Sequence, residues 1–321
     1  MKGPLVIYDP RDPYRYLYDV DDGKRMYCSY EPRTEIVFRR DNHHHPCRLV
    51  LFRCVSDMPN VLIVLSRYHN VSPVLNYIIG TSANSTLVNG LGRYAGGPKS
   101  DLAAVNVQYG KRYRFRLVAM SCDSNFIFSI DGHNFTVIEA DGILTEPLLV
   151  DSIQMLAGQR YSIVLNATQP VDNYWIRALP NTPNATFVGG LNSAILRYSG
   201  APSQDPTTNH TQSEAPFLEQ NLHALSHPGA PGIPEYGKAD INIQITAQNI
   251  GGVYYMNGAR YRPPTVPVLL QIMSGAQQAT DLMPNGSVIV LESNKVVELT
   301  MNTTGFGGPV SFILPPCPYR C

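Results

Sequence analysis

Apolar and polar residues alternate in short runs along most of this chain, and this period of two constrains the fold more than any other feature. In the run 112–117, arginines at the even positions alternate with Tyr113, Phe115 and Leu117. The same alternation recurs in the runs 126–130, 161–165, 174–178, 241–245 and 297–301. Turn pairs such as Asp131-Gly132 and Asn257-Gly258 separate these runs. Short alternating strands joined by tight turns predict an all-β fold built of β-sandwiches.

The charge balance excludes some classes of partner. The formal net charge is zero and only 16% of residues are charged, so no long-range field attracts nucleic acid or a charged membrane surface. No apolar run reaches transmembrane length. With 321 residues, the chain has room for two domains and pieces of a third. We therefore predict no nucleic-acid partner and no membrane partner, and composition does not predict the oligomeric state.

Eight Asn-x-Ser/Thr sequons indicate a secreted protein. Chance matching would give about three from this content of Asn, Ser and Thr. The candidate glycosylation sites are Asn84, Asn166, Asn184, Asn209, Asn285 and Asn302; the other two sequons begin at Asn70 and Asn134. The first ten residues contain no apolar run long enough for a signal peptide. Incidental matches in a Thr- and Asn-rich β protein are the alternative explanation.

The organisation of the chain follows from shifts in composition. Residues 23–58 form an atypical insert that lacks a periodic apolar face. Residues 200–237 are rich in Pro, Ser, Thr and Asn and predict a surface linker. A further region begins at residue 238.

The histidines and cysteines suggest a metal site only weakly. Of the six cysteines, three lie within the insert and two within the last five residues, which argues against a disulfide framework. His43, His44 and His45 precede Cys47 closely, so a new metal site there is one hypothesis. An incidental exposed cluster is the other. His133, in an Asp-Gly-His-Asn turn, is expected to be structural.

Long runs of residues resemble the fungal, basidiomycete-type laccases of the multicopper oxidase family. The clearest are Phe128-Ser129-Ile130-Asp131-Gly132-His133-Asn134 and Val171-Asp172-Asn173-Tyr174-Trp175-Ile176-Arg177. With the opening Gly3-Pro4-Leu5-Val6, such motifs cover about four fifths of the chain. The resemblance implies cupredoxin-like Greek-key β-sandwiches. It implies that residues 73–199 form the complete middle domain, residues 1–72 a remnant of the first domain and residues 238–321 a truncated third domain.

The resemblance also implies a reaction and a cofactor. Laccases oxidise phenols by one electron and reduce dioxygen to water, with copper held by histidines and one cysteine. The copper-binding motifs of that family lie outside the runs that match here; where the third-domain His run would follow Gly307-Gly308-Pro309, the chain reads Val310-Ser311-Phe312. No copper ligand can be assigned to any position, so we expect this chain to bind no copper set and to be inactive as written.

Two residues match substrate-pocket positions of the family. Asp123, in Ser121-Cys122-Asp123, corresponds to the carboxylate that accepts a hydrogen bond and a proton from the phenol. Asn181, which follows Leu179-Pro180, corresponds to a second pocket residue, and Thr182 replaces the aromatic residue usual after it. The resemblance places the disulfide partner of Cys122 in a segment not found here. A non-catalytic, secreted β-sandwich that binds small aromatic molecules through Asp123 and Asn181 is the alternative function.

The interruptions in the resemblance predict an error in how the gene was read. Asp22-Gly23-Lys24-Arg25 can be encoded with a splice-donor sequence. Leu314-Pro315-Pro316 can be encoded by codons that spell Phe-His-Leu when they are read one base later. Sequencing the transcript across codons 1, 22–60 and 309–321 tests this hypothesis. We expect a spliced message that lacks the insert codons. A mature message that starts at Met1 and keeps both segments in frame would refute it.

Overall fold

The chain divides into two compact units, Met1–His227 and Pro228–Cys321. The computed structural model describes residues 9–21, 62–68, 85–121, 125–181, 184–226, 231–251, 253–260, 266–275, 286 and 288–302. The insert 23–58, with its histidines and cysteines, lies outside the described residues. The domain boundaries after residues 72, 199 and 237 remain predictions.

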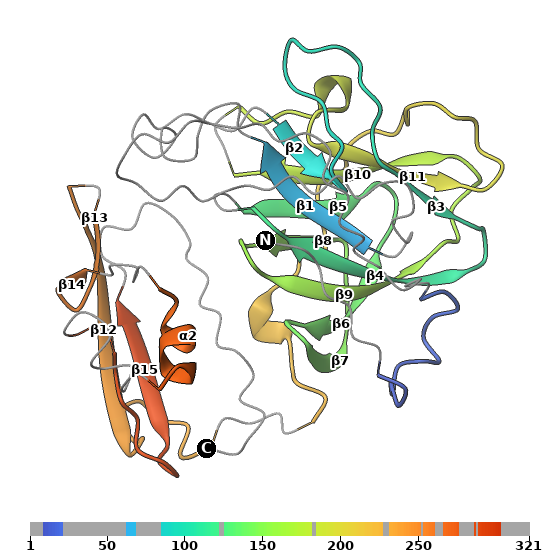
Figure 1. The fold of residues 1–321 in the computed structure, drawn as a ribbon. Coiled ribbons are helices and arrows are strands. Elements are labelled where there is room, and N and C mark those ends of the chain that lie inside the picture. Colours follow the sequence, from blue (N-terminus) through green and yellow to red (C-terminus); the bar gives the residue numbers. More distant parts are fainter. Residues whose placement is uncertain are drawn as a thin grey trace. The chain divides into compact units, whose positions relative to one another are not determined.

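The first unit contains a six-stranded sheet whose neighbours are often distant in the chain (Figure 1). Its strands are β1 Leu62–Tyr68, β2 Ser85–Val88, β4 Arg112–Ala119, β6 Phe135–Ala140, β7 Ile143–Val150 and β9 Arg160–Asn166. Their order across the sheet is β2-β1-β4-β9-β6-β7. Strands β1 and β4 pair in parallel and the other pairs are antiparallel. Such crossovers between non-consecutive strands are typical of Greek-key sandwiches.

A five-stranded sheet forms the second layer of the same unit. Its strands are β3 Ala104–Val107, β5 Phe126–Ile130, β8 Ser152–Met155, β10 Asn173–Pro180 and β11 Ser193–Tyr198. Their order is β3-β11-β10-β5-β8, with β3 and β11 parallel. Two short 3-10 helices, Val188–Gly190 and Glu219–Asn221, lie in the connections.

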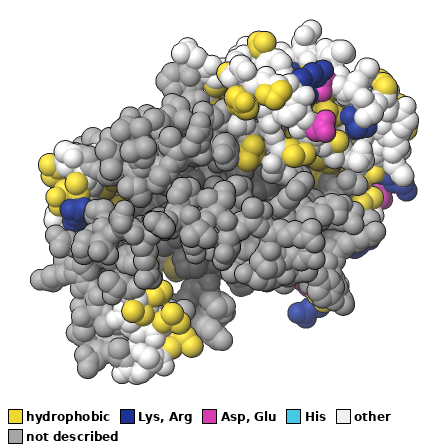
Figure 2. Space-filling model, turned by 45° about the horizontal axis from the view of Figure 1, so that its top comes forward, with side chains coloured by type: hydrophobic (Ala, Val, Ile, Leu, Met, Phe, Trp, Pro, Cys, Tyr) yellow, Lys and Arg dark blue, Asp and Glu magenta, His cyan; other side chains and the backbone are white. Residues whose placement is uncertain are grey.

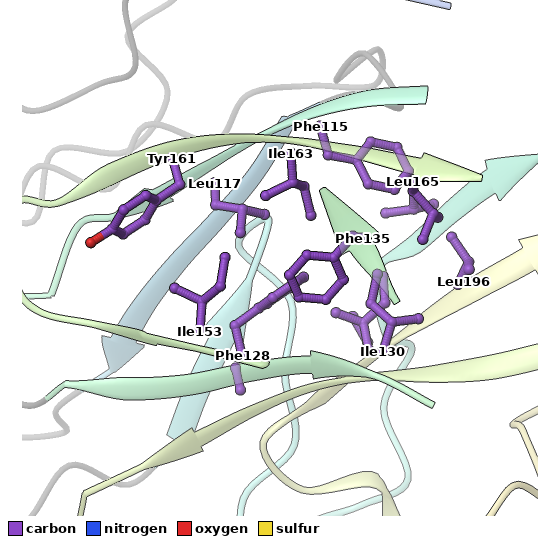
Figure 3. Packing of buried hydrophobic residues seen from close by; sticks show 14 of the residues in the cluster. Phe115, Leu117, Phe128, Ile130, Phe135, Ile153, Tyr161, Ile163, Leu165 and Leu196 are labelled. Atoms are coloured by element: carbon purple, nitrogen blue, oxygen red, sulfur yellow. The ribbon is translucent and has the colours of Figure 1, made fainter. Parts of the chain in front are cut away.

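The two sheets pack through one apolar core (Figure 3). Phe115 and Leu117 of β4 and Phe128 of β5 have no exposed surface. Phe128 meets Phe135 of β6 edge to face, with ring centroids 5.8 Å apart. Burial of these large side chains is the main driving force for closing the sandwich, at about 25 cal/mol per Å² of apolar surface removed from water.

The predicted alternation is confirmed in the first unit. Along β5, Phe126, Phe128 and Ile130 are buried, whereas Ile127 keeps 46% of its surface exposed. Along β9 and β10 the predicted inward residues are buried as well: Tyr161, Ile163, Leu165, Tyr174, Ile176 and Ala178. Because strand side chains point alternately to opposite faces, each predicted apolar set reaches the core together.

The second unit contains a four-stranded sheet. Its strands are β12 Ile241–Ile250, β13 Val253–Met256, β14 Ala259–Arg260 and β15 Val297–Asn302, in the order β14-β13-β12-β15. A short helix, α2 Val268–Met273, lies in the same unit. Asn257 and Gly258 both have positive φ, 49° and 77°, as the tight turn between β13 and β14 requires. Apolar side chains such as Ile250 and Leu299 remain exposed.

Charged side chains of both signs appear on the face shown in Figure 2. At its upper right, Lys and Arg side chains lie next to Asp and Glu side chains, whereas other Lys and Arg side chains on this face stand apart from them. No helix in the described part of the chain is both long and apolar enough to span a membrane.

The core predicts a sharp difference between neighbouring positions on β5. Phe128→Ala should lower the free energy of unfolding by about 3–5 kcal/mol, because it removes a buried ring and leaves a cavity. Ile127→Ala, one residue earlier and half exposed, should change it by no more than about 0.5–1 kcal/mol. Denaturant unfolding of both variants measures the difference. Equal losses would mean that the two positions do not face different environments.

Candidate functional site

Asn181 lies at one end of the five-stranded sheet. Strand β10 ends at the buried Pro180, which pairs with Phe126 of β5. The backbone N–H of Asn181 donates to the carbonyl oxygen of Asn125, 3.1 Å away, and its side chain is exposed. The chain therefore presents an exposed amide just beyond a rigid strand end, a position typical of ligand-contacting residues.

Asp123, the other residue assigned to this pocket, lies outside the described residues, as do Cys122 and Thr182. Among the candidate glycosylation sites, Asn166, Asn184, Asn209 and Asn302 are exposed, whereas Asn84 and Asn285 lie outside the described residues.

The described residues do not fit a metal centre. They contain no group of three or more His, Cys, Asp or Glu side chains arranged to hold a metal ion. His133 is 5% exposed, and both of its ring nitrogens face hydrogen-bond partners, which confirms its structural role. The cluster His43–Cys47 lies outside the described residues. No copper ligand can be assigned from this geometry.

A buried ion pair joins Asp131, in the turn directly after β5, to Arg177 of β10. Arg177 Nε and Nη2 donate to the two carboxylate oxygens of Asp131 at 2.7 and 2.6 Å. Thr208 Oγ1 donates to the same carboxylate at 2.6 Å. Both charged side chains are 4–5% exposed. The guanidinium also stacks on Phe187, 4.6 Å from the ring centroid. A two-point pair with further partners offsets the cost of burying two charges.

The outer face of β4 carries a ladder of three arginines paired with aspartates of residues 9–21. Arg112 pairs with Asp19 at 2.9 Å, and Arg116 pairs with Asp21. Between them, Arg114 pairs with Asp12 and with Glu139 of β6, both at 2.6 Å. These pairs, with a backbone bridge between Val20 and Tyr113, attach residues 9–21 to the sheet.

The electrostatics of the ladder follow from these contacts. Burial disfavours the charged form of Asp12, but hydrogen bonds from the Tyr18 hydroxyl and the Tyr14 N–H, together with the charge of Arg114, leave the pKa of Asp12 below its usual value. The more exposed Asp19 accepts hydrogen bonds from Arg112, which lower its pKa to about 2. A polar hollow of about 360 Å³ lies among these residues. All three arginines of the ladder are paired with carboxylates.

The segment 201–226 runs along the first unit and makes specific contacts with it. Asp205 accepts hydrogen bonds from the buried Arg93, and Ser213 donates to Asp151. Farther on, Phe217 is buried and meets Tyr161 edge to face at 5.3 Å. This segment is therefore attached to the sandwich at several points.

Comparison with known proteins agrees with this architecture. A family model described as multicopper oxidase matches residues 67–201. Among solved structures, the laccase of Botrytis aclada superposes with a TM-score of 0.54 at 23% identity, covering 68% of this chain and 43% of its own. Fet3p, a multicopper oxidase that functions in iron import, superposes with a TM-score of 0.58 at 21% identity, covering 75% and 47%. The fold is thus the cupredoxin-like one of multicopper oxidases.

Among multicopper oxidases, this chain is similar in sequence to fungal laccases. Laccase-2 of Pleurotus ostreatus is 49% identical over 316 residues, which is 98% of this chain and 52% of that protein. Laccase-2 of Trametes versicolor is 46% identical over 98% of this chain and 54% of that protein. The chain is a homologue of basidiomycete laccases, and its residues 67–201 match the multicopper oxidase family. It spans about half the length of the curated relatives it matches.

The buried pair predicts a large cost for removing one charge. Asp131→Asn should lower the free energy of unfolding by about 3–5 kcal/mol, because the Arg177 guanidinium is left buried without its counter-ion. Asp19→Asn, in the exposed pair with Arg112, should scarcely move the unfolding midpoint at pH 7. Chemical denaturation measures both.

A double-mutant cycle separates the pair from its surroundings. Asp131→Asn combined with Arg177→Met should cost less than the sum of the two single substitutions, since neither charge is then left alone. Strict additivity would show that the two groups do not interact in solution.

Proposed function

We propose that this chain is part of a laccase-type oxidase, a protein that oxidises phenols by one electron and reduces dioxygen to water. The observation that carries the proposal is the sequence identity of 46–49% with two fungal laccases over 98% of the chain. The phenolic substrates, dioxygen, the copper cofactor and the extracellular location are all taken from those relatives.

Within this reaction, Asp123 and Asn181 contact the phenol. Asp123 lies two residues before Asn125 in the sequence. Asn125 in turn accepts the backbone hydrogen bond of Asn181. This contact between Asn181 and a near sequence neighbour of Asp123 supports the assignment of both residues to one pocket. The Asp123 carboxylate accepts the phenol hydroxyl and takes its proton as the electron leaves, while the Asn181 amide orients the ring.

In this proposal the 321-residue chain does not by itself form the copper sites of the family. Copper sites require several histidines and a cysteine in fixed geometry, and the described residues contain no such group. The part of the protein in hand therefore supplies the scaffold and the substrate side. Electron transfer from the phenol would require ligands that we cannot assign to this sequence.

A second function is favoured by the same features: a non-catalytic, secreted module that binds small aromatic molecules. The first unit has both sheets and a packed core, and the end that carries Asn181 belongs to this sandwich. A rigid scaffold that presents binding residues does not depend on metal.

Metal analysis combined with phenol binding tests these proposals. The purified 321-residue chain, incubated with copper and dialysed, should contain little copper and should not oxidise 2,6-dimethoxyphenol. The same phenol should bind in a ligand-observed NMR titration. Blue colour with near-stoichiometric copper and turnover would overturn the copper-free proposal.

Variants at the assigned pocket test the residue roles. Asp123→Asn should weaken phenol binding about tenfold or more, since a charge-assisted hydrogen bond contributes about 1.5–3 kcal/mol. Asn181→Ala should weaken it less. Asn221→Ala, an exposed amide in the 3-10 helix Glu219–Asn221, is the matched control and should have no effect. Unchanged binding in both pocket variants would remove this substrate site.

A further inference from the structure

Tyr198 and His133 form a buried hydrogen-bonded pair that the proposed oxidase function does not use. Tyr198, at the end of β11, has no exposed surface. Its hydroxyl oxygen lies 2.7 Å from Nε2 of His133. On the other side of the imidazole, Nδ1 lies 2.8 Å from the carbonyl oxygen of Asp131. The ring is thus held between one group that can only accept and one that can donate.

These contacts determine where the protons lie. A carbonyl oxygen cannot donate, so His133 Nδ1 carries a proton. Burial lowers the pKa of His133, and the hydrogen bond to the Asp131 carbonyl and the Asp131 charge oppose this effect only in part. The ring is therefore neutral at neutral pH, and Nε2 is an acceptor. The Tyr198 hydroxyl therefore donates to Nε2. Its oxygen accepts from the backbone N–H of Gln169, 3.2 Å away, which completes the arrangement.

Other tyrosine hydroxyls of the first unit meet poorer proton acceptors. Tyr14 donates to the carbonyl of Thr145 and Tyr174 to that of Pro170, and a backbone carbonyl does not take up a proton. Tyr18 donates to Asp12, whose pKa lies below its usual value. Tyr161 lies 3.3 Å from Glu219, a long contact for a hydroxyl donor. Tyr198 has the most basic acceptor in this group, a neutral imidazole.

We propose that Tyr198 and His133 form a proton-coupled redox pair that gives one electron to a strong one-electron oxidant. In this step the electron leaves the Tyr198 ring and reduces the oxidant by one unit. The O–H bond of Tyr198 breaks and an N–H bond forms at His133 Nε2. The products are a neutral tyrosyl radical, a histidine imidazolium and the reduced oxidant.

The position in the fold suits this role. A phenol that loses an electron becomes a far stronger acid, so even an imidazole whose pKa is lowered by burial takes its proton. The Asp131 carbonyl remains bonded to Nδ1–H and favours the imidazolium. His133 also lines a surface hollow of about 280 Å³ with Asn134 and Gln169. The Tyr174 ring, which is 8% exposed, packs against the Tyr198 ring with centroids 5.5 Å apart.

Photochemical oxidation of the full chain tests the pair. Tris(bipyridine)ruthenium(III), generated by light in the presence of a cobalt(III) acceptor, is the oxidant, and samples are frozen for electron paramagnetic resonance. We expect a tyrosyl signal in the unmodified chain that is lost in Tyr198→Phe. His133→Gln keeps a hydrogen-bond acceptor but cannot take a proton, so the signal should also be lost there. Tyr174→Phe and Tyr18→Phe are the controls and should keep it.

A measurement on the unmodified chain keeps the test independent of folding in the variants. A tyrosyl radical hydrogen-bonded to an imidazolium has a smaller gx value in high-field spectra than a radical without a hydrogen bond. We expect the reduced value. A radical without a hydrogen bond, a signal that persists in Tyr198→Phe, or a full yield in a folded His133→Gln variant would overturn the proposal.

Discussion

The alternation of side chains along β4 is the constraint on which the rest of the first unit depends. Its odd positions supply Tyr113, Phe115 and Leu117 to the core, while its even positions supply three arginines to the opposite face. A slip of one residue would drive guanidinium groups into the core and aromatic rings out of it. Because β1 and β9 both pair with β4, its register sets the register of the six-stranded sheet.

Buried ion pairs attach the segments 9–21 and 201–226 to the sandwich, which the alternation of side chains in the strands does not do. Arg114 of β4 binds Asp12 of the segment 9–21, and Asp131, paired with Arg177, binds Thr208 of the segment 201–226. Each pair joins residues far apart in the chain, and each is embedded in further hydrogen bonds. Such networks contribute less to net stability than the core, since desolvation offsets much of the attraction. They select one arrangement of the connecting segments, because any other would leave a buried charge unpaired.

The strands of the first unit were predictable because alternation is a local property. Along β5, Phe126, Phe128 and Ile130 were expected inside and are buried. The pairing of Asp131 with Arg177 was not predictable, since 46 positions separate them and either residue alone is typical of a solvated turn or strand face. The placing of Asn181 beside Asn125 also required the register of β10 with β5. The family motif identifies Asn181 as a candidate, but only the pairing of β10 with β5 shows that Asn125 is its neighbour.

The sequence by itself determined the class of fold and the ancestry of this protein. Period-two patterning predicts β-sandwiches, and runs such as 171–177 are specific enough to indicate a laccase homologue. The tertiary structure alone decided which charges pair, how residues 9–21 and 201–226 attach to the sandwich, and that Tyr198 donates to His133. The physical reason is the distance along the chain between the residues that interact. Side-chain direction in a strand follows from neighbouring residues, whereas an ion pair or a buried hydrogen bond depends on which distant strands the core brings together.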